Sequence, residues 1–201
     1  MAHAALGLRT HSGWAVSVAV TGRLNAPSVI DRCRIEMADP ATPGSTQPYH
    51  AAAGLDLKKA EEFVKRCGDS ATHLAEQAVR ALIDKLREKN HEVLGSGILL
   101  GSGRPAPALA ATLASHALIH TAEGELFRSA LTRAIERCGL PLTAIQEREL
   151  WARSSVDLHM TMDELQHSII EMGRPIGPPW RQDEKYAALV GWLALADISR
   201  R

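Results

Sequence analysis

The stretch GWAVSVAVT, residues 13–21, decides the fold class, because large and small side chains alternate along its length. The large residues share one face of an extended chain: Trp14, Val16, Val18 and Val20. A period of two that is rich in β-branched residues is typical of a β-strand, whereas a helix repeats about every 3.6 residues. The stretch therefore predicts a strand close to the N-terminus.

Two further apolar segments flank this strand and predict strands of their own. Residues 4–10 precede it and end in the turn-like sequence THSG at 10–13. Residues 28–37 follow a second turn at 22–27 and carry another set of apolar side chains on one side. Three short strands joined by tight turns form an antiparallel meander.

The middle of the chain changes from extended to helical patterning. Residues 39–54 are rich in Pro, Gly and Ser and predict a surface loop. From residue 56 to residue 89, apolar residues recur every three or four positions, as expected of an amphipathic helix, and Asn90 ends it. Residues 93–100 form a short apolar run that predicts a buried strand.

The remaining segments add helices and one more strand. Residues 107–138 predict a helix, and residues 142–147 predict a strand. Residues 161–173 and 181–198 predict two further helices. The first of these helices is expected to break near Gly124. Thr161 and Glu164 have the spacing of a capping box, and the Pro- and Gly-rich loop 173–180 precedes the last helix.

The order of elements is β-β-β-α-β-α-β-α, which predicts an α/β protein with a single domain at residues 1–201. The fourth and fifth strands are reached through helices, so they should run parallel to the first strand. We expect a mixed five-stranded sheet with helices on both faces, and with the first strand in its centre.

Composition restricts the partners and the location of the protein. The 23 basic and 23 acidic residues give a formal net charge of zero. This balance argues against a strong positive electrostatic potential over the whole protein that would attract nucleic acid, but it allows a local basic patch. Cys33, Cys67 and Cys138 have no CxxC spacing, which indicates a reducing, cytoplasmic location. The longest apolar run, residues 187–196, is too short to cross a bilayer, so no membrane association is expected.

Several short motifs occur in an order that resembles a known family. They are LGL at 6–8 with GWAV at 13–16, EG at 123–124 with GLPL at 139–142, ELWA at 149–152 with MDEL at 162–165, and Asp183 with AAL at 187–189. Together they resemble the Holliday-junction resolvase branch of the RNase H-like superfamily. The resemblance implies the RNase H fold and covers the first hairpin and most of residues 92–199.

The resemblance also implies where the catalytic carboxylates of such an enzyme stand, and this sequence departs from that pattern. Arg9 and Thr10 stand where the resemblance implies an Asp on the first strand, just after Leu8, and residues 101–103 stand where it implies a Glu at the end of the fourth strand. In the last helix, Asp183 matches the first acidic position and Tyr186 occupies the second. Paired divalent ions need clustered carboxylates, so we interpret the nuclease site as lost.

Two constellations remain as ligand sites. His116, His120 and Glu123 share one face of a continuous helix and could hold a divalent metal, or they are ordinary polar residues at a helix edge. At the carboxyl edge of the sheet, Arg9, Thr10 and His11 would meet Ser102, Arg104 and Asp183. Two arginines beside one carboxylate favour a phosphate, sulfate or carboxylate ligand there; otherwise residues 101–104 are a plain strand-to-helix turn.

Two functions therefore stay open. The first is a non-catalytic RNase H-fold protein that binds nucleic acid, a small anionic ligand or a protein, including a second copy of itself in a homodimer. The second is an enzyme with a rebuilt active site, such as a metal-dependent nuclease or hydrolase, with Asp183 and His11 as its catalytic candidates. No cofactor is implied beyond a divalent metal.

Overall fold

A computed structural model describes residues 1–101 and 107–200 of the chain. Its five strands are β1 (Ala2–His11), β2 (Trp14–Arg23), β3 (Ala26–Glu36), β4 (His91–Leu100) and β5 (Leu142–Gln146). They form one sheet in the order β3-β2-β1-β4-β5. β1, β2 and β3 form the predicted antiparallel meander, and β4 lies parallel to both β1 and β5. The predicted sheet, with β1 in its centre, is confirmed.

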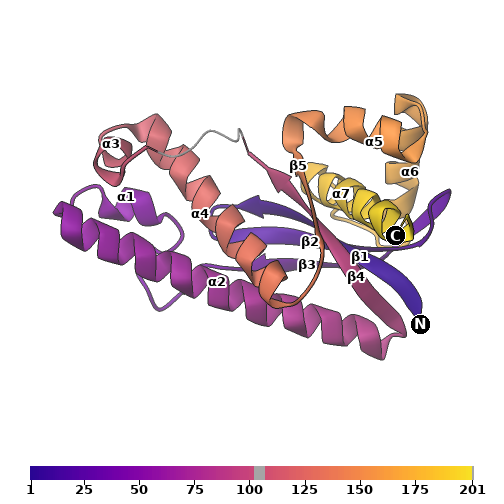
Figure 1. Ribbon diagram of the computed structural model, residues 1–201, viewed down its shortest axis with the longest axis horizontal. Helices are drawn as coiled ribbons and strands as arrows, with labels where there is room; N and C mark the ends of the chain where they lie inside the picture. The colour runs from indigo at the N-terminus through magenta and orange to yellow at the C-terminus, as the bar shows by residue number, and fades with distance from the viewer. Residues whose placement is uncertain (102–106, 201) are drawn as a thin grey trace.

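Helices cover both faces of this sheet (Figure 1). One face carries α2 (Leu57–Glu88) and α4 (His116–Arg137), with the short helices α1 (Pro48–Ala52) and α3 (Leu109–Leu113) at one end. The other face carries α7 (Gln182–Ser199), α5 (Leu150–Leu158) and α6 (Met162–Gly173). A 3₁₀ turn, η1 (Glu147–Glu149), links β5 to α5. No helix in the described part of the chain is long and apolar enough to cross a membrane.

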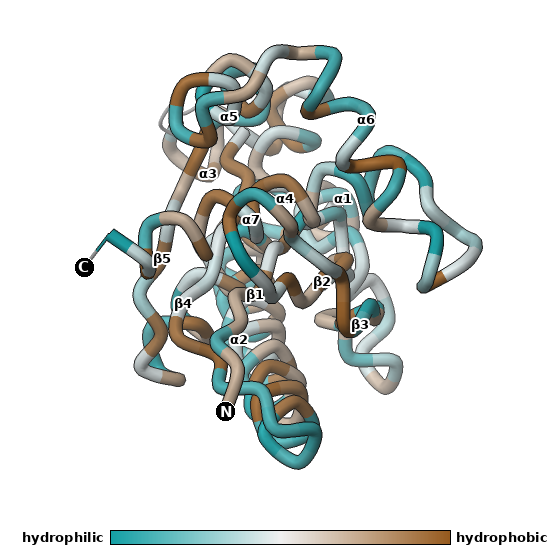
Figure 2. The backbone as a smooth tube through the Cα atoms, turned by 90° about the vertical axis from the view of Figure 1, so that its right-hand side faces the viewer, coloured by the Kyte–Doolittle hydropathy of each residue, from teal (hydrophilic) through white to brown (hydrophobic). Residues whose placement is uncertain are grey.

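The alternation along β2 divides its side chains between two hydrophobic cores. Val16, Val18 and Val20 pack against α7 in one core. Ala15 and Ala19 pack towards α2 and α4 in the other. The tube of α2 in Figure 2 changes between hydrophobic and hydrophilic residues within each turn, as expected of an amphipathic helix with one solvent-exposed face.

α7 lies unusually close to the sheet because glycines stand at the contact points. A Cβ atom added at Gly7 would lie 1.7 Å from the carbonyl oxygen of Ala187, and one at Gly97 would lie 2.3 Å from that of Val190. On the helix side of this contact stands Gly191, which also has no side chain. This contact determines how the first turn of α7 meets the carboxyl end of β1.

Two sequence-based predictions about helices are wrong. The segment 39–54 is not all loop, because α1 forms at Pro48–Ala52, with Pro48 in its first turn, where proline needs no amide donor. The helix predicted at 107–138 breaks before Ser115, an extended N-cap residue, and not at Gly124, which lies inside α4. The predicted capping box of Thr161 and Glu164 is present at the start of α6.

Candidate functional site

The carboxyl ends of β1, β4 and β5 lie at one edge of the sheet because these strands are parallel. β1 brings Arg9, Thr10 and His11 to this edge. Glu147 comes directly after β5, and Asp183 reaches the edge from the first turn of α7. We call this group of residues the carboxyl-edge site.

Arg9 is the centre of the carboxyl-edge site. Its guanidinium forms a bidentate pair with Glu147, in which Nη2 lies 2.8 Å from Oε1 and Nε lies 3.3 Å from Oε2. Nη1 donates to Oδ1 of Asp183. The same group lies 4.9 Å from the ring centre of Tyr186, and its side chain is only 14% exposed. Arg9 is therefore an internal cation that holds two carboxylates from distant parts of the chain.

His11 extends the network outwards. Its Nε2 lies 3.0 Å from Oδ1 of Asp183, the oxygen that also accepts from Arg9. The imidazole stacks on Trp14 at 4.3 Å between ring centres, and the guanidinium of Arg34 lies over the indole at 3.9 Å. Asp183 thus faces two basic side chains, one from each end of this network.

A pocket of about 230 Å³ opens beside Arg9, between the ends of β1, β4 and β5. Its polar lining residues are Arg9, Thr10, Arg128, Glu147 and Arg148. Among residues 1–101 and 107–200, the buried hydroxyl oxygen of Thr10 has no hydrogen-bond partner. The pocket thus combines three arginines with an unused hydroxyl group.

Arg128 reaches this pocket because two neighbouring glycines have no side chain in its way. A Cβ atom at Gly101 would lie 2.7 Å from Nη2 of Arg128, and one at Gly124 would lie 3.0 Å from its Nη1. Arg128 pairs with Glu125 at 3.2 Å, and its side chain is mostly buried. Gly124, expected to break the helix, is instead the residue that makes room for a guanidinium at the end of β4.

The structure brings together three of the residues predicted for this edge: Arg9, His11 and Asp183. Thr10 lines the adjoining pocket, while Ser102 and Arg104 lie outside the described residues. Sequence reasoning missed Glu147 and Arg128. The signal for Glu147 was available, because it directly follows a strand whose carboxyl end lies at this edge. Nothing local in the sequence points to Arg128.

The predicted metal-ligating residues lie elsewhere, at the start of α4, and the group differs from the prediction. His116 and His120 share one helix face, and His50 of α1 completes a cluster of three imidazoles. Glu123 stands behind His50, with its side chain 1% exposed, and its Oε1 lies 2.9 Å from Nδ1 of His50. His50 was missed because it lies in the segment predicted as loop.

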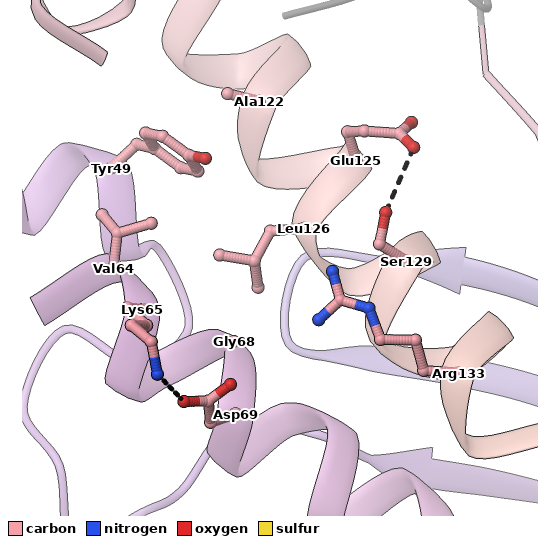
Figure 3. Close-up of a pocket in the computed structure, with 10 residues that line it drawn as sticks. All are labelled: Tyr49, Val64, Lys65, Gly68, Asp69, Ala122, Glu125, Leu126, Ser129 and Arg133. Carbon is pink, nitrogen blue, oxygen red and sulfur yellow. Dashed lines mark hydrogen bonds and ion pairs between the residues drawn. The ribbon is translucent and has the colours of Figure 1, made fainter. Parts of the chain in front are cut away.

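A larger pocket, of about 290 Å³, lies between α1, α2 and α4 (Figure 3). Val64, Ala122 and Leu126 supply its apolar surface. Its polar side chains largely engage one another, as in the Lys65–Asp69 ion pair and the bond from Ser129 to Glu125 (Figure 3). This pairing leaves the pocket a weaker candidate than the carboxyl-edge site.

The sequence matches no protein-family model and no curated protein. Among solved structures, the chain is similar to RuvC of Thermus thermophilus in complex with a Holliday junction substrate, with a TM-score of 0.55 and 10% sequence identity. A second structure of Thermus thermophilus RuvC gives a TM-score of 0.54 at 10% identity. Each alignment covers 98% of this chain and 96% of RuvC. The chain has the RNase H-like fold.

With this fold, the positions that the family resemblance assigns to carboxylates converge in space. Arg9 contacts both Asp183 and Tyr186, and it shares a pocket with Gly101. These positions therefore lie together in the structure, and the charged residues that occupy them are Arg9 and Asp183.

Proposed function

We propose that this chain binds phosphate groups of nucleic acid at the carboxyl-edge site and does not cleave it. One observation carries the proposal: guanidinium groups stand at both places where the family resemblance implies a strand-end carboxylate. Arg9 replaces the first, and Arg128 lies against Gly101 in the region of the second.

The absence of Mg²⁺-dependent cleavage follows from this charge inversion. Mg²⁺ selects oxygen ligands, and a two-ion mechanism needs several carboxylates free to coordinate. The carboxylates of Asp183 and Glu147 are already held by Arg9. A divalent cation at this place would also be repelled by the adjacent guanidinium groups.

The same inversion supports binding of an anion. Arg128 and Arg148 line the pocket beside Arg9, and the hydroxyl of Thr10 supplies a further polar group. Arginine presents planar donors that match phosphate oxygens. Because RuvC has been seen with a Holliday junction, we infer a phosphodiester backbone as the ligand. The free cysteines fit a cytoplasmic location.

The test combines binding with cleavage on the same substrates. Duplex and four-way-junction DNA are titrated against the wild type, Arg128→Ala, Arg148→Ala and the control Arg87→Ala, whose arginine pairs with Asp84 at the far end of α2. Loss of one charge-assisted contact weakens binding about tenfold, and the control leaves binding unchanged. With Mg²⁺, cleavage stays at the level of a mock preparation.

Two results would contradict the proposal. Equal affinity in all four proteins would exclude this pocket as the phosphate site. Cleavage that disappears on Asp183→Asn or His11→Ala would favour the second function, an enzyme rebuilt around the hydrogen bond between these two residues.

A further inference from the structure

A second site lies at the start of α4, where α1 and α3 also lie (Figure 1). His116 and His120 stand one turn apart on α4, and His50 projects from α1. The centre of the His50 ring lies 5.3 Å from that of His116 and 4.8 Å from that of His120, and the latter two centres are 4.4 Å apart. We call these residues the histidine cluster.

The cluster has the donor atoms of a transition-metal site. One ring nitrogen from each histidine lies within 4.8 Å of the others. Nitrogen ligands of a tetrahedral zinc ion stand about 3.4 Å apart, given Zn–N bonds of about 2.1 Å. His116 and His120 are exposed, so small rotations of their side chains close this difference.

Glu123 fixes the orientation of His50, which a chance grouping of surface histidines would lack. Its Oε1 accepts from the backbone amide of His50, at 3.1 Å, and lies 2.9 Å from Nδ1 of the same residue. Because Oε1 already accepts from the backbone amide, the tautomer of His50 that matches this contact has its proton on Nδ1, and that tautomer leaves the lone pair of Nε2 free for a metal ion. Carboxylate, histidine and metal are commonly arranged in this way in metalloproteins.

The burial of Glu123 supplies a second reason to expect a cation. The residue is 0% exposed, and in the described part of the structure its Oε2 has no hydrogen-bond partner. A buried carboxylate is costly unless a positive charge lies close to it. A metal ion on Nε2 of His50 would provide that charge across the imidazole.

We propose that His50, His116 and His120 bind one Zn²⁺ ion, with Glu123 as the positioning residue behind His50. A fourth coordination position would face solvent, because two of the three ligands are exposed. The ion joins residues 66 and 70 positions apart in the sequence, so it pins α1 against α4. Imidazole nitrogens suit zinc and disfavour Mg²⁺, which separates this site from the carboxyl-edge site.

The experiment measures binding of Zn²⁺ alone to the full chain without a histidine tag, by calorimetry and by thermal unfolding. We expect one ion per chain and a higher melting temperature with Zn²⁺ but not with Mg²⁺. His116→Ala and His120→Ala each lower the affinity by at least about tenfold, and so does Glu123→Gln. His73→Ala, which removes an exposed histidine from α2, leaves the affinity unchanged.

His116 and His120 are exposed, so their variants retain the fold and keep the test decisive. If Zn²⁺ binds the wild type no more tightly than the His116→Ala/His120→Ala double variant, the proposal is wrong. The His50–Glu123 bond is then only an anchor for α1. Co²⁺ provides an independent readout, because its visible spectrum reports tetrahedral coordination in the wild type and loses it in the double variant.

Discussion

At the scale of single residues, Arg9 determines the chemistry of the carboxyl edge. It holds Glu147 and Asp183 on one guanidinium and lies against Tyr186, so a single side chain links β1, η1 and α7. If the same position carried a carboxylate, three acidic groups would face one another. Their mutual repulsion would then favour a divalent cation instead of an anion.

This reversal gives a residue-scale prediction for Arg9→Asp. The variant loses two ion pairs and gains a third acidic group, so it unfolds at a lower temperature than the wild type. Mg²⁺ at a hundred times its dissociation constant adds about 2.7 kcal/mol to the free energy of unfolding of the variant, which raises its melting temperature, and it leaves the wild type unaffected. Arg87→Asp is the matched charge control. An equal Mg²⁺ response in both variants would mean that the edge does not gather carboxylates.

At the scale of elements, the carboxyl edge depends on how closely α7 packs on the sheet. Gly7 of β1 and Gly191 of α7 face each other with no side chain between them. The helix therefore lies low enough on β1 for Asp183, in its first turn, to meet Arg9. The Leu-Gly-Leu pattern of β1 thus serves the site as well as the core.

We predict that Gly7→Ala disrupts this contact. Its Cβ atom would overlap the backbone of α7, which cannot move aside as a flexible side chain can. The free energy of unfolding should fall by about 3 kcal/mol, near the upper end for overpacked cores. Urea denaturation measures the change. Gly54→Ala is the control, since nothing lies within 4 Å of its added methyl group, and a similar loss there would refute the packing argument.

At the scale of the whole molecule, the charges balance, and the basic groups at the carboxyl edge act locally. The chain carries 23 basic and 23 acidic residues, and most of the described arginines near the site also contact an acidic residue. Long-range attraction of a polyanion is therefore weak. Under the proposed function, affinity for nucleic acid therefore has to come from the few groups that line the pocket beside Arg9.

The salt dependence of binding tests this view. Each phosphate contact contributes about −0.9 to the slope of log K against log salt concentration, so two or three contacts give a slope of about −2 to −3. Titrations of duplex DNA across a series of salt concentrations measure it. A slope of about −7 or steeper would require an extended basic surface, and the carboxyl-edge site would then be only part of the interface.

The sequence by itself determined the sheet, the two faces of β2 and the position of Arg9 at the carboxyl end of β1, because strand alternation and motif order are local properties. It also paired His116 with His120, since residues four apart share a helix face. Only the tertiary structure brought Glu147 to Arg9 across 138 positions, and Glu123 to His50 across 73. Such contacts depend on how the helices pack on the sheet. Hydrophobic packing is not directional, so the polar residues that it brings together carry no recognisable short-range sequence pattern.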